Sequence, residues 1–110
     1  MRIPIVTGLI CLTAALNVAA ADVKENWEKH CVKCHGADGK GDTKMGKKLE
    51  VRDYSSAQVQ ATLKDDAMAK AIKEGVKEKD SDKIKMKAFA EMLSDDEIKG
   101  LVAHVRSLKK

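Results

Sequence analysis

The stretch that decides the fold is Cys31-Val32-Lys33-Cys34-His35. Two thiols three positions apart on one helical turn can both reach vinyl groups along one edge of a porphyrin and form thioethers, and the next residue places an imidazole under the iron. The motif therefore predicts one c-type haem, covalently attached through Cys31 and Cys34. His35 is the predicted proximal ligand of the haem iron.

Residues 1–21, upstream of the motif, have the pattern of a secretory signal peptide: a basic residue near the start, a short apolar run, and small residues up to Ala21. The apolar run is too short to span a bilayer. We expect cleavage after Ala21, although cleavage after Ala20 fits almost as well, and a single domain at 22–110. Maturation of c-type haem outside the bacterial cytoplasm favours export further. A soluble periplasmic protein without stable membrane insertion is predicted.

Three other interpretations of the motif compete with haem attachment. A thioredoxin-like dithiol would need a preceding strand in a βαβ context, whereas this motif ends a predicted helix. A zinc site needs four protein ligands, or three and a water. The chain after the signal peptide offers only two thiols, with His30, His35 and His104 lacking paired spacing. The third interpretation is a chance pair of buried cysteines.

The domain is rich in charge and poor in large apolar side chains. All 17 acidic residues and all basic residues except Arg2 lie in it, which leaves a net charge of +3, and its aromatic residues are Trp27, Tyr54 and Phe89. One small domain is too short for a two-domain nucleotide-binding enzyme. With so thin a core, a metal, an oligomer or a cofactor has to complete the interior. The small net charge gives no case for nucleic-acid binding.

Helical periodicity and capping residues predict an all-α fold, and no alternating apolar run indicates a strand. Asp22 is expected to cap a first helix. Its apolar face would consist of Val23, Trp27, Cys31 and Cys34. Residues 36–54 are predicted to form a polar loop. Ser55 and Gln58 resemble a capping box that starts a short helix.

Two further helices follow in the prediction. Asp65 or Asp66 can cap the first of them, and Gly75 would end it. The last helix starts from a capping box of Ser94 and Glu97. One apolar stripe on this helix consists of Ile98, Leu101, Val102, Val105 and Leu108.

The sequence resembles the class I c-type cytochromes, specifically the short monohaem bacterial type. Trp27 stands four residues before the motif, where the family places an aromatic that packs against the last helix. Residues 36–41 are similar to the family's loop after the motif, and 86–89 and 93–106 to its ligand methionine segment and C-terminal helix. The resemblance covers 22–110. It implies a small helical fold wrapped around one haem, with electron transfer as the activity.

Four methionines of the domain are candidates for the sixth iron ligand: Met45, Met68, Met86 and Met92. Met86 lies between two lysines in a stretch predicted to be irregular, where ligation would explain an apolar side chain, and the resemblance implies the same residue. Met68 and Met92 are predicted to fill the core, and Met45 to cover the haem edge. Met92 and then His104 stay open as alternatives.

Three residues depart from the family pattern. Lys87 stands where proline commonly follows the ligand methionine, which predicts a less stiff segment. His104 replaces an aromatic that faces the first helix and is expected to be a packed, partly exposed residue. Val23 replaces a glycine at the helix crossing, which predicts slightly wider spacing. His30, in addition, is expected to point away from the haem face.

Two protein ligands would leave the iron no open site, so we expect a monomeric periplasmic electron-transfer protein and not an enzyme. One alternative is a five-coordinate haem enzyme or ligand sensor, in which Met86 is labile. Another is a haem subunit of an exported oxidoreductase complex.

The expected partners are transient redox proteins with acidic docking faces, because lysines gather on both loops that would approach the iron. Arg52 and Tyr54 could hydrogen-bond a haem propionate. The lysines of these loops are Lys33, Lys40, Lys44, Lys47, Lys48, Lys83, Lys85 and Lys87.

Overall fold

The computed structural model describes residues 4, 8 and 16–110, with side chains described at 4, 8 and 22–110. Most of the predicted signal peptide therefore lies outside the described residues, and its removal stays a prediction. In the described part, no helix is both long and apolar enough to cross a membrane. The fold is all-α, as predicted, except that the same part also contains a two-stranded hairpin.

The first helix, α1, spans Leu16–His30, and after Cys31 the short α2 spans Val32–His35. The predicted start at Asp22 is wrong, because the alanine-rich backbone before Asp22 is also helical. The backbone carbonyls of those residues accept from the amides that follow, so no side-chain cap is needed at Asp22. Trp27 is buried on α1 as expected. Its carbonyl accepts a hydrogen bond from the Cys31 amide at 2.9 Å, which carries the helical turn into the motif.

The polar stretch after the motif contains a helix that the sequence did not predict, α3, which spans Lys44–Leu49. Thr43 caps it: the threonine hydroxyl accepts from the Gly46 amide at 2.8 Å and donates to the Cys34 carbonyl at 2.8 Å. A Cβ on Gly46 would overlap that same Cys34 carbonyl. The helix is thus fastened to the motif by a cap and a glycine rather than by an apolar stripe.

The helix α4 spans Ala57–Thr62. Its N-cap is Ser56, whose hydroxyl accepts from the Val59 amide, so the predicted capping box at Ser55 is wrong by one residue. The Ser55 amide instead donates to an Asp53 carboxylate oxygen at 2.9 Å, in a turn that precedes the helix.

The helix α5 spans Asp65–Glu74. Its N-cap is Lys64, so Asp65 and Asp66 are not the cap; they lie in the first turn, where carboxylates favour the positive end of the helix dipole. Gly75 ends the helix at φ 81°, as predicted.

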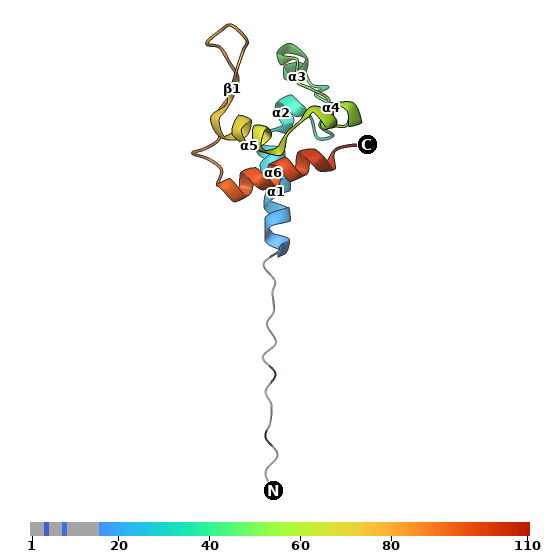
Figure 1. Ribbon diagram of the computed structural model, residues 1–110, viewed down its shortest axis with the longest axis vertical. Coiled ribbons are helices and arrows are strands. Elements are labelled where there is room, and N and C mark those ends of the chain that lie inside the picture. The colour runs from blue at the N-terminus through green and yellow to red at the C-terminus, as the bar shows by residue number, and fades with distance from the viewer. Residues whose placement is uncertain (1–3, 5–7, 9–15) are drawn as a thin grey trace.

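Strands β1, Val76–Lys77, and β2, Ile84–Met86, pair antiparallel after α5. Val76 lies opposite Met86 and Lys77 opposite Ile84, with an irregularity between the two β1 residues. Met86 therefore belongs to a strand, and the prediction of an irregular stretch is wrong. In Figure 1 the hairpin projects beyond α5, and the loop at its tip is separated from α3.

The last helix, α6, spans Asp95–Ser107 and begins with the predicted capping box. The Ser94 hydroxyl accepts from the Glu97 amide at 3.1 Å, and the Glu97 carboxylate accepts from the Ser94 amide at 3.0 Å. Four residues of the predicted stripe are buried and the fifth, Leu108, is half-buried. The buried four are Ile98, Leu101, Val102 and Val105.

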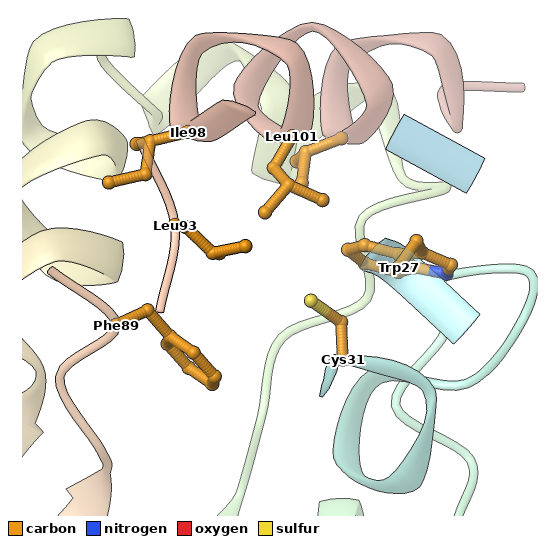
Figure 2. Close-up of a cluster of buried hydrophobic side chains, with 7 residues drawn as sticks. Trp27, Cys31, Phe89, Leu93, Ile98 and Leu101 are labelled. Atoms are coloured by element: carbon orange, nitrogen blue, oxygen red, sulfur yellow. The ribbon is translucent and has the colours of Figure 1, made fainter. Parts of the chain in front are cut away.

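The helix α6 crosses α1 at the centre of the fold (Figure 1). A Cβ on Gly100 would overlap the Val23 side chain, so the glycine of this crossing lies on α6 instead of α1. The Asn26 amide donates to Glu97 at 3.0 Å and adds a polar tie between the two helices. Figure 2 shows the core that this crossing encloses. The core consists of Trp27, Cys31, Phe89, Leu93, Ile98, Leu101 and Val105.

Candidate functional site

A cavity of about 700 Å³ lies between the motif, α5 and the hairpin. This volume falls within the range of about 300–1,000 Å³ found for small-molecule and cofactor sites. The lining runs from buried residues such as Phe89 to exposed ones such as Lys33, so the cavity opens to solvent. Its lining includes Cys31, Cys34 and His35 of the motif, Ala67, Met68 and Ala71 of α5, and Val76, Lys85 and Met86 of the hairpin.

Both motif cysteines are free thiols that face this cavity. One helical turn holds them together, because the amides of Cys34 and His35 both donate to the Cys31 carbonyl, at 3.2 and 2.9 Å. Cys31 is buried, and its burial, with a smaller contribution from Cys34, raises its pKa to about 11. The pair is thus arranged as two thiols on one side of a turn.

The His35 ring packs against two aromatic side chains. The Trp27 ring centroid is 5.8 Å away in a tilted arrangement, and the Tyr54 ring is stacked at 5.3 Å. Its Nδ1 is buried and has no hydrogen-bond partner among the described residues. Burial lowers the pKa of His35, which favours the neutral imidazole that binds metals.

Met86 and Met68 both line the cavity, so the structure brings two candidate sixth ligands to it. The prediction that Met92 fills the core is wrong: 48% of Met92 is exposed, because it lies in the turn that precedes α6. Met45 is half-buried on α3 and is not among the lining residues, so its predicted role as a cover is not supported.

The segment that carries Met86 is held in place despite Lys87. The Phe89 amide donates to the Ile72 carbonyl at 2.9 Å, which ties this segment to the end of α5. A Cβ on Gly75 would lie 2.7 Å from the Met86 carbonyl oxygen, so the two backbones approach closely. Strand pairing, a hydrogen bond and a glycine contact restrain the segment where the family commonly has proline.

The two remaining histidines occupy different places. His104 is half-buried on α6 and packs on Trp27 at a centroid distance of 4.8 Å, as expected for a packed helix residue. It is not among the residues that line the cavity. The prediction that His30 points away is wrong: His30 lines the cavity and packs edge-on against Phe89 at 5.5 Å. The helix α1 ends at His30, so the direction of this side chain could not be predicted from one continuous helix through the motif.

Residues 20–109 match the family described as cytochrome c. The chain belongs to the cytochrome c family. Among solved structures it is similar to the KustC0563 c-type cytochrome, with 36% sequence identity and a TM-score of 0.71; the match covers 81% of this chain and 99% of that chain. A mutant of the same cytochrome gives 35% identity, a TM-score of 0.68 and coverage of 80% and 99%. No protein in the curated comparison matches this chain.

Membership of this family makes the protein a haem-binding electron-transfer protein with a covalently attached haem c and its iron. The predicted family and cofactor are thereby confirmed. The site of this cytochrome also fits that group, since two thiols and an imidazole meet beside aliphatic walls. Across the described residues, no group of three or more His, Cys, Asp or Glu side chains is placed to hold a metal ion by itself.

Basic side chains dominate the charged part of the cavity lining. Five are basic and one, Glu50, is acidic. Arg52 and Tyr54 both belong to the lining, as a propionate contact would require, and burial raises the pKa of Tyr54 so that its phenol stays a donor. The basic lining residues are Lys29, Lys33, Arg52, Lys85 and Lys87.

Several lining residues escaped the sequence reasoning. Leu49, Leu63 and Val76 each come from an element that was mispredicted or from its end. One signal could have predicted α3: Thr43 is a residue type favoured at helix N-caps, and its hydroxyl accepts from the Gly46 amide three positions later.

Proposed function

We propose that this cytochrome is a monomeric periplasmic electron carrier whose single haem is attached through Cys31 and Cys34 and ligated by His35 and Met86. The observation that carries the proposal is the convergence of all four side chains on one cavity, although Met86 lies 51 positions after His35 in the chain. The bound haem would supply a one-electron ferric/ferrous couple.

The chain's own residues set the conditions for that couple. Trp27 and Tyr54 both pack against the His35 ring, which restrains its orientation. Phe89, Leu63 and Met68 give the cavity apolar walls that reduce water access. A thioether ligand raises the reduction potential, and the apolar walls favour the iron state of lower charge. Both effects suit an electron carrier.

We propose Met86 and not Met68 as the ligand because of the element on which each residue lies. Both methionines pack against the core cluster, but they lie on different elements: Met68 on the helix α5, and Met86 on the strand β2, in a segment that a backbone hydrogen bond ties to the end of α5. The family resemblance implies Met86, and its position on a separate chain segment from the motif and α5 suits a ligand that closes the cavity.

One observation favours an alternative, a haem enzyme or sensor with an open iron site. His30 lines the cavity and could act there as an acid or base. Its edge-on packing against Phe89 argues for a fixed, structural imidazole. Ligation of the iron by methionine would exclude an open site, so one experiment distinguishes the two functions.

That experiment compares Met86→Ala with Met68→Ala, both made in the haem-loaded protein. The ferric wild type should show the weak near-infrared charge-transfer band of an iron–sulfur bond. Met86→Ala should abolish the band, open the iron to added imidazole and lower the reduction potential, while Met68→Ala keeps all three properties. Loss of the band in Met68→Ala alone would assign the ligand to Met68. A wild type without the band that binds ligands freely would favour the open-site alternative.

Attachment and location have their own measurements. Acid–acetone extraction should leave the haem on the chain, and haem released into the solvent would refute attachment through Cys31 and Cys34. Osmotic-shock fractionation of cells that express the full chain should release the protein with the periplasmic fraction. Retention in the cytoplasm or membranes would contradict the proposed location.

A further inference from the structure

The Met86 segment, residues 86–90, lies with its backbone against the end of α5. The last carbonyls of a helix have no partner within the helix. In α5 the Ile72 carbonyl accepts a hydrogen bond from the Phe89 amide at 2.9 Å. The Lys73 carbonyl accepts from the Ala90 amide at 3.3 Å. The Met86 segment thus supplies donors that this helix end lacks.

Gly75, which directly follows α5, touches the same segment. A Cβ at this position would lie 2.7 Å from the Met86 carbonyl oxygen, 2.9 Å from the Ala88 amide nitrogen and 3.1 Å from the Lys87 carbonyl carbon. All three are backbone atoms, so none can turn aside as the end of a flexible side chain can. Gly75 also has φ 81° and ψ 177°, a conformation that is nearly restricted to glycine. A residue with a Cβ would have to displace the backbone that carries Met86.

The backbone contacts of the Met86 segment come from one short stretch of the chain, residues 72–76. This stretch supplies the two hydrogen bonds, the glycine contact and the strand partner Val76, which lies opposite Met86. Near the far end of the segment, Phe89 is 4% exposed and belongs to the core (Figure 2). The position of the Met86 backbone therefore depends on how closely residues 72–76 approach it.

The helix α5 is itself attached to the rest of the fold. At its start the Arg106 guanidinium of α6 donates to the Asp65 carboxylate at 2.8 Å. Near its end the Lys73 ammonium lies 3.4 Å from the Asp95 carboxylate of α6. Ile72 packs against the core cluster between these two contacts. A segment held by α5 is thus held by the core of the protein and not by a loop.

We propose that Gly75 is a positioning residue for Met86, because its missing side chain lets the end of α5 fix the backbone from which Met86 reaches the haem iron. This proposal rests on the proposed function, which makes Met86 the sixth ligand. Gly75 and its neighbours would replace the restraint that proline supplies at position 87 in the family pattern. A fixed Met86 would keep the iron closed to added ligands.

The test compares Gly75→Ala with Gly100→Ala, both in the haem-loaded protein. Gly100→Ala is the matched control because its Cβ also overlaps a neighbour, Val23, at a helix crossing that does not line the cavity. The readouts are the near-infrared iron–sulfur band, the apparent affinity for added imidazole, and the urea concentration at which the whole protein unfolds. The first two report on Met86, and the third reports on global stability.

Gly75→Ala should weaken the iron–sulfur band and bind imidazole about tenfold more tightly than the wild type, a change that the strain of a non-glycine residue in this conformation can produce. Gly100→Ala should unfold at a lower urea concentration than the wild type and keep its band and imidazole affinity. A Gly75→Ala protein that only unfolds earlier would overturn the proposal, because Gly75 would then serve the helix end alone. Equal changes of band and affinity in both variants would overturn it as well, since any loss of stability would then release Met86.

A measurement on the wild type covers the case in which Gly75→Ala does not fold. Hydrogen exchange of the Phe89 and Ala90 amides reports release of the Met86 segment from α5. In urea concentrations below the unfolding transition, this exchange should accelerate in parallel with loss of the iron–sulfur band. A change in either one without the other would overturn the role of the α5 end. A wild type that never shows the band would instead refute the proposed methionine ligation, and the positioning role with it.

Discussion

Gln60 offers a sharp test of how the polar interior supports the site. It is 5% exposed, and its side-chain amide donates to the Tyr54 carbonyl at 2.7 Å and to the Val105 carbonyl at 2.8 Å. Its own oxygen accepts from Arg106 at 3.1 Å. One side chain thus joins α4, α6 and the loop whose Tyr54 stacks on His35.

Gln60→Leu keeps the side-chain size and removes both donors. Each lost hydrogen bond costs about 0.5–1.5 kcal/mol, and a carbonyl left buried without a donor costs about 1–3 kcal/mol. The Val105 carbonyl keeps a longer bond from the Leu108 amide at 3.2 Å, so the larger penalty applies to Tyr54. We expect the free energy of unfolding to fall by about 2–4 kcal/mol, which corresponds to a decrease in Tm of about 8–30 °C for a domain of this size.

The assay is urea unfolding of the haem-loaded protein, followed by far-ultraviolet circular dichroism. The matched control is Gln58→Leu, the same substitution at an exposed position of the same helix, for which a change within about 0.5 kcal/mol is expected. A Gln60→Leu protein no less stable than Gln58→Leu would refute the reasoning that the buried amide bonds hold these elements together.

Two further predictions concern the contacts of α6. Gly100→Ala should lower the free energy of unfolding by about 1–3 kcal/mol because its Cβ overlaps Val23, and by less in a Val23→Ala background; an equal loss in both backgrounds would contradict the crossing geometry. Burial lowers the pKa of His104, so below its unfolded value of 6.5 the unfolded chain binds more protons and stability should fall as pH decreases through the folded pKa. Unfolding curves of His104→Phe should lose this part of the pH dependence, since His35 is common to both proteins; identical pH profiles would show that His104 does not contribute.

The sequence predicted those parts of the molecule whose signals are local. The motif needs only five consecutive residues, and α6 combines a capping box with an apolar stripe, so both were readable without any knowledge of the fold. The end of α5 at Gly75 is a similar case. The N-cap of α4 is Ser56 and not the predicted Ser55, because two neighbouring serines can both cap and only the final chain path decides between them.

The errors arise where a residue's partner is distant in sequence. Residues 36–54 were predicted to be a polar loop, but the missing side chain of Gly46 lets α3 pack against the Cys34 carbonyl. The hairpin strands have two and three residues, too few for an alternating pattern to appear. His30 was misplaced because the prediction extended one helix through Cys31, where the structure starts a new turn.

The same elements explain how a domain with three aromatic residues forms a core. The buried apolar residues of α6 pack on α1 and Phe89, which makes the helix crossing a closed core. The elements α3, α4 and α5 contain only Gly46 and Gln60 as buried residues. Several half-buried side chains of α3, α5 and the hairpin line the cavity instead. These side chains include Leu49, Met68 and Met86.

Apolar side chains that face a cavity gain stability only when something apolar covers them. In a cytochrome c that cover is the haem. The backbone of α3 is fastened to the motif and the hairpin segment to α5, while their cavity-facing apolar side chains would pack on the cofactor. Amphipathic periodicity records contacts between side chains, so it is strong for α6 and weak for α3 and the hairpin. A weak amphipathic pattern is therefore what we expect for elements whose apolar side chains face a cofactor and not another helix.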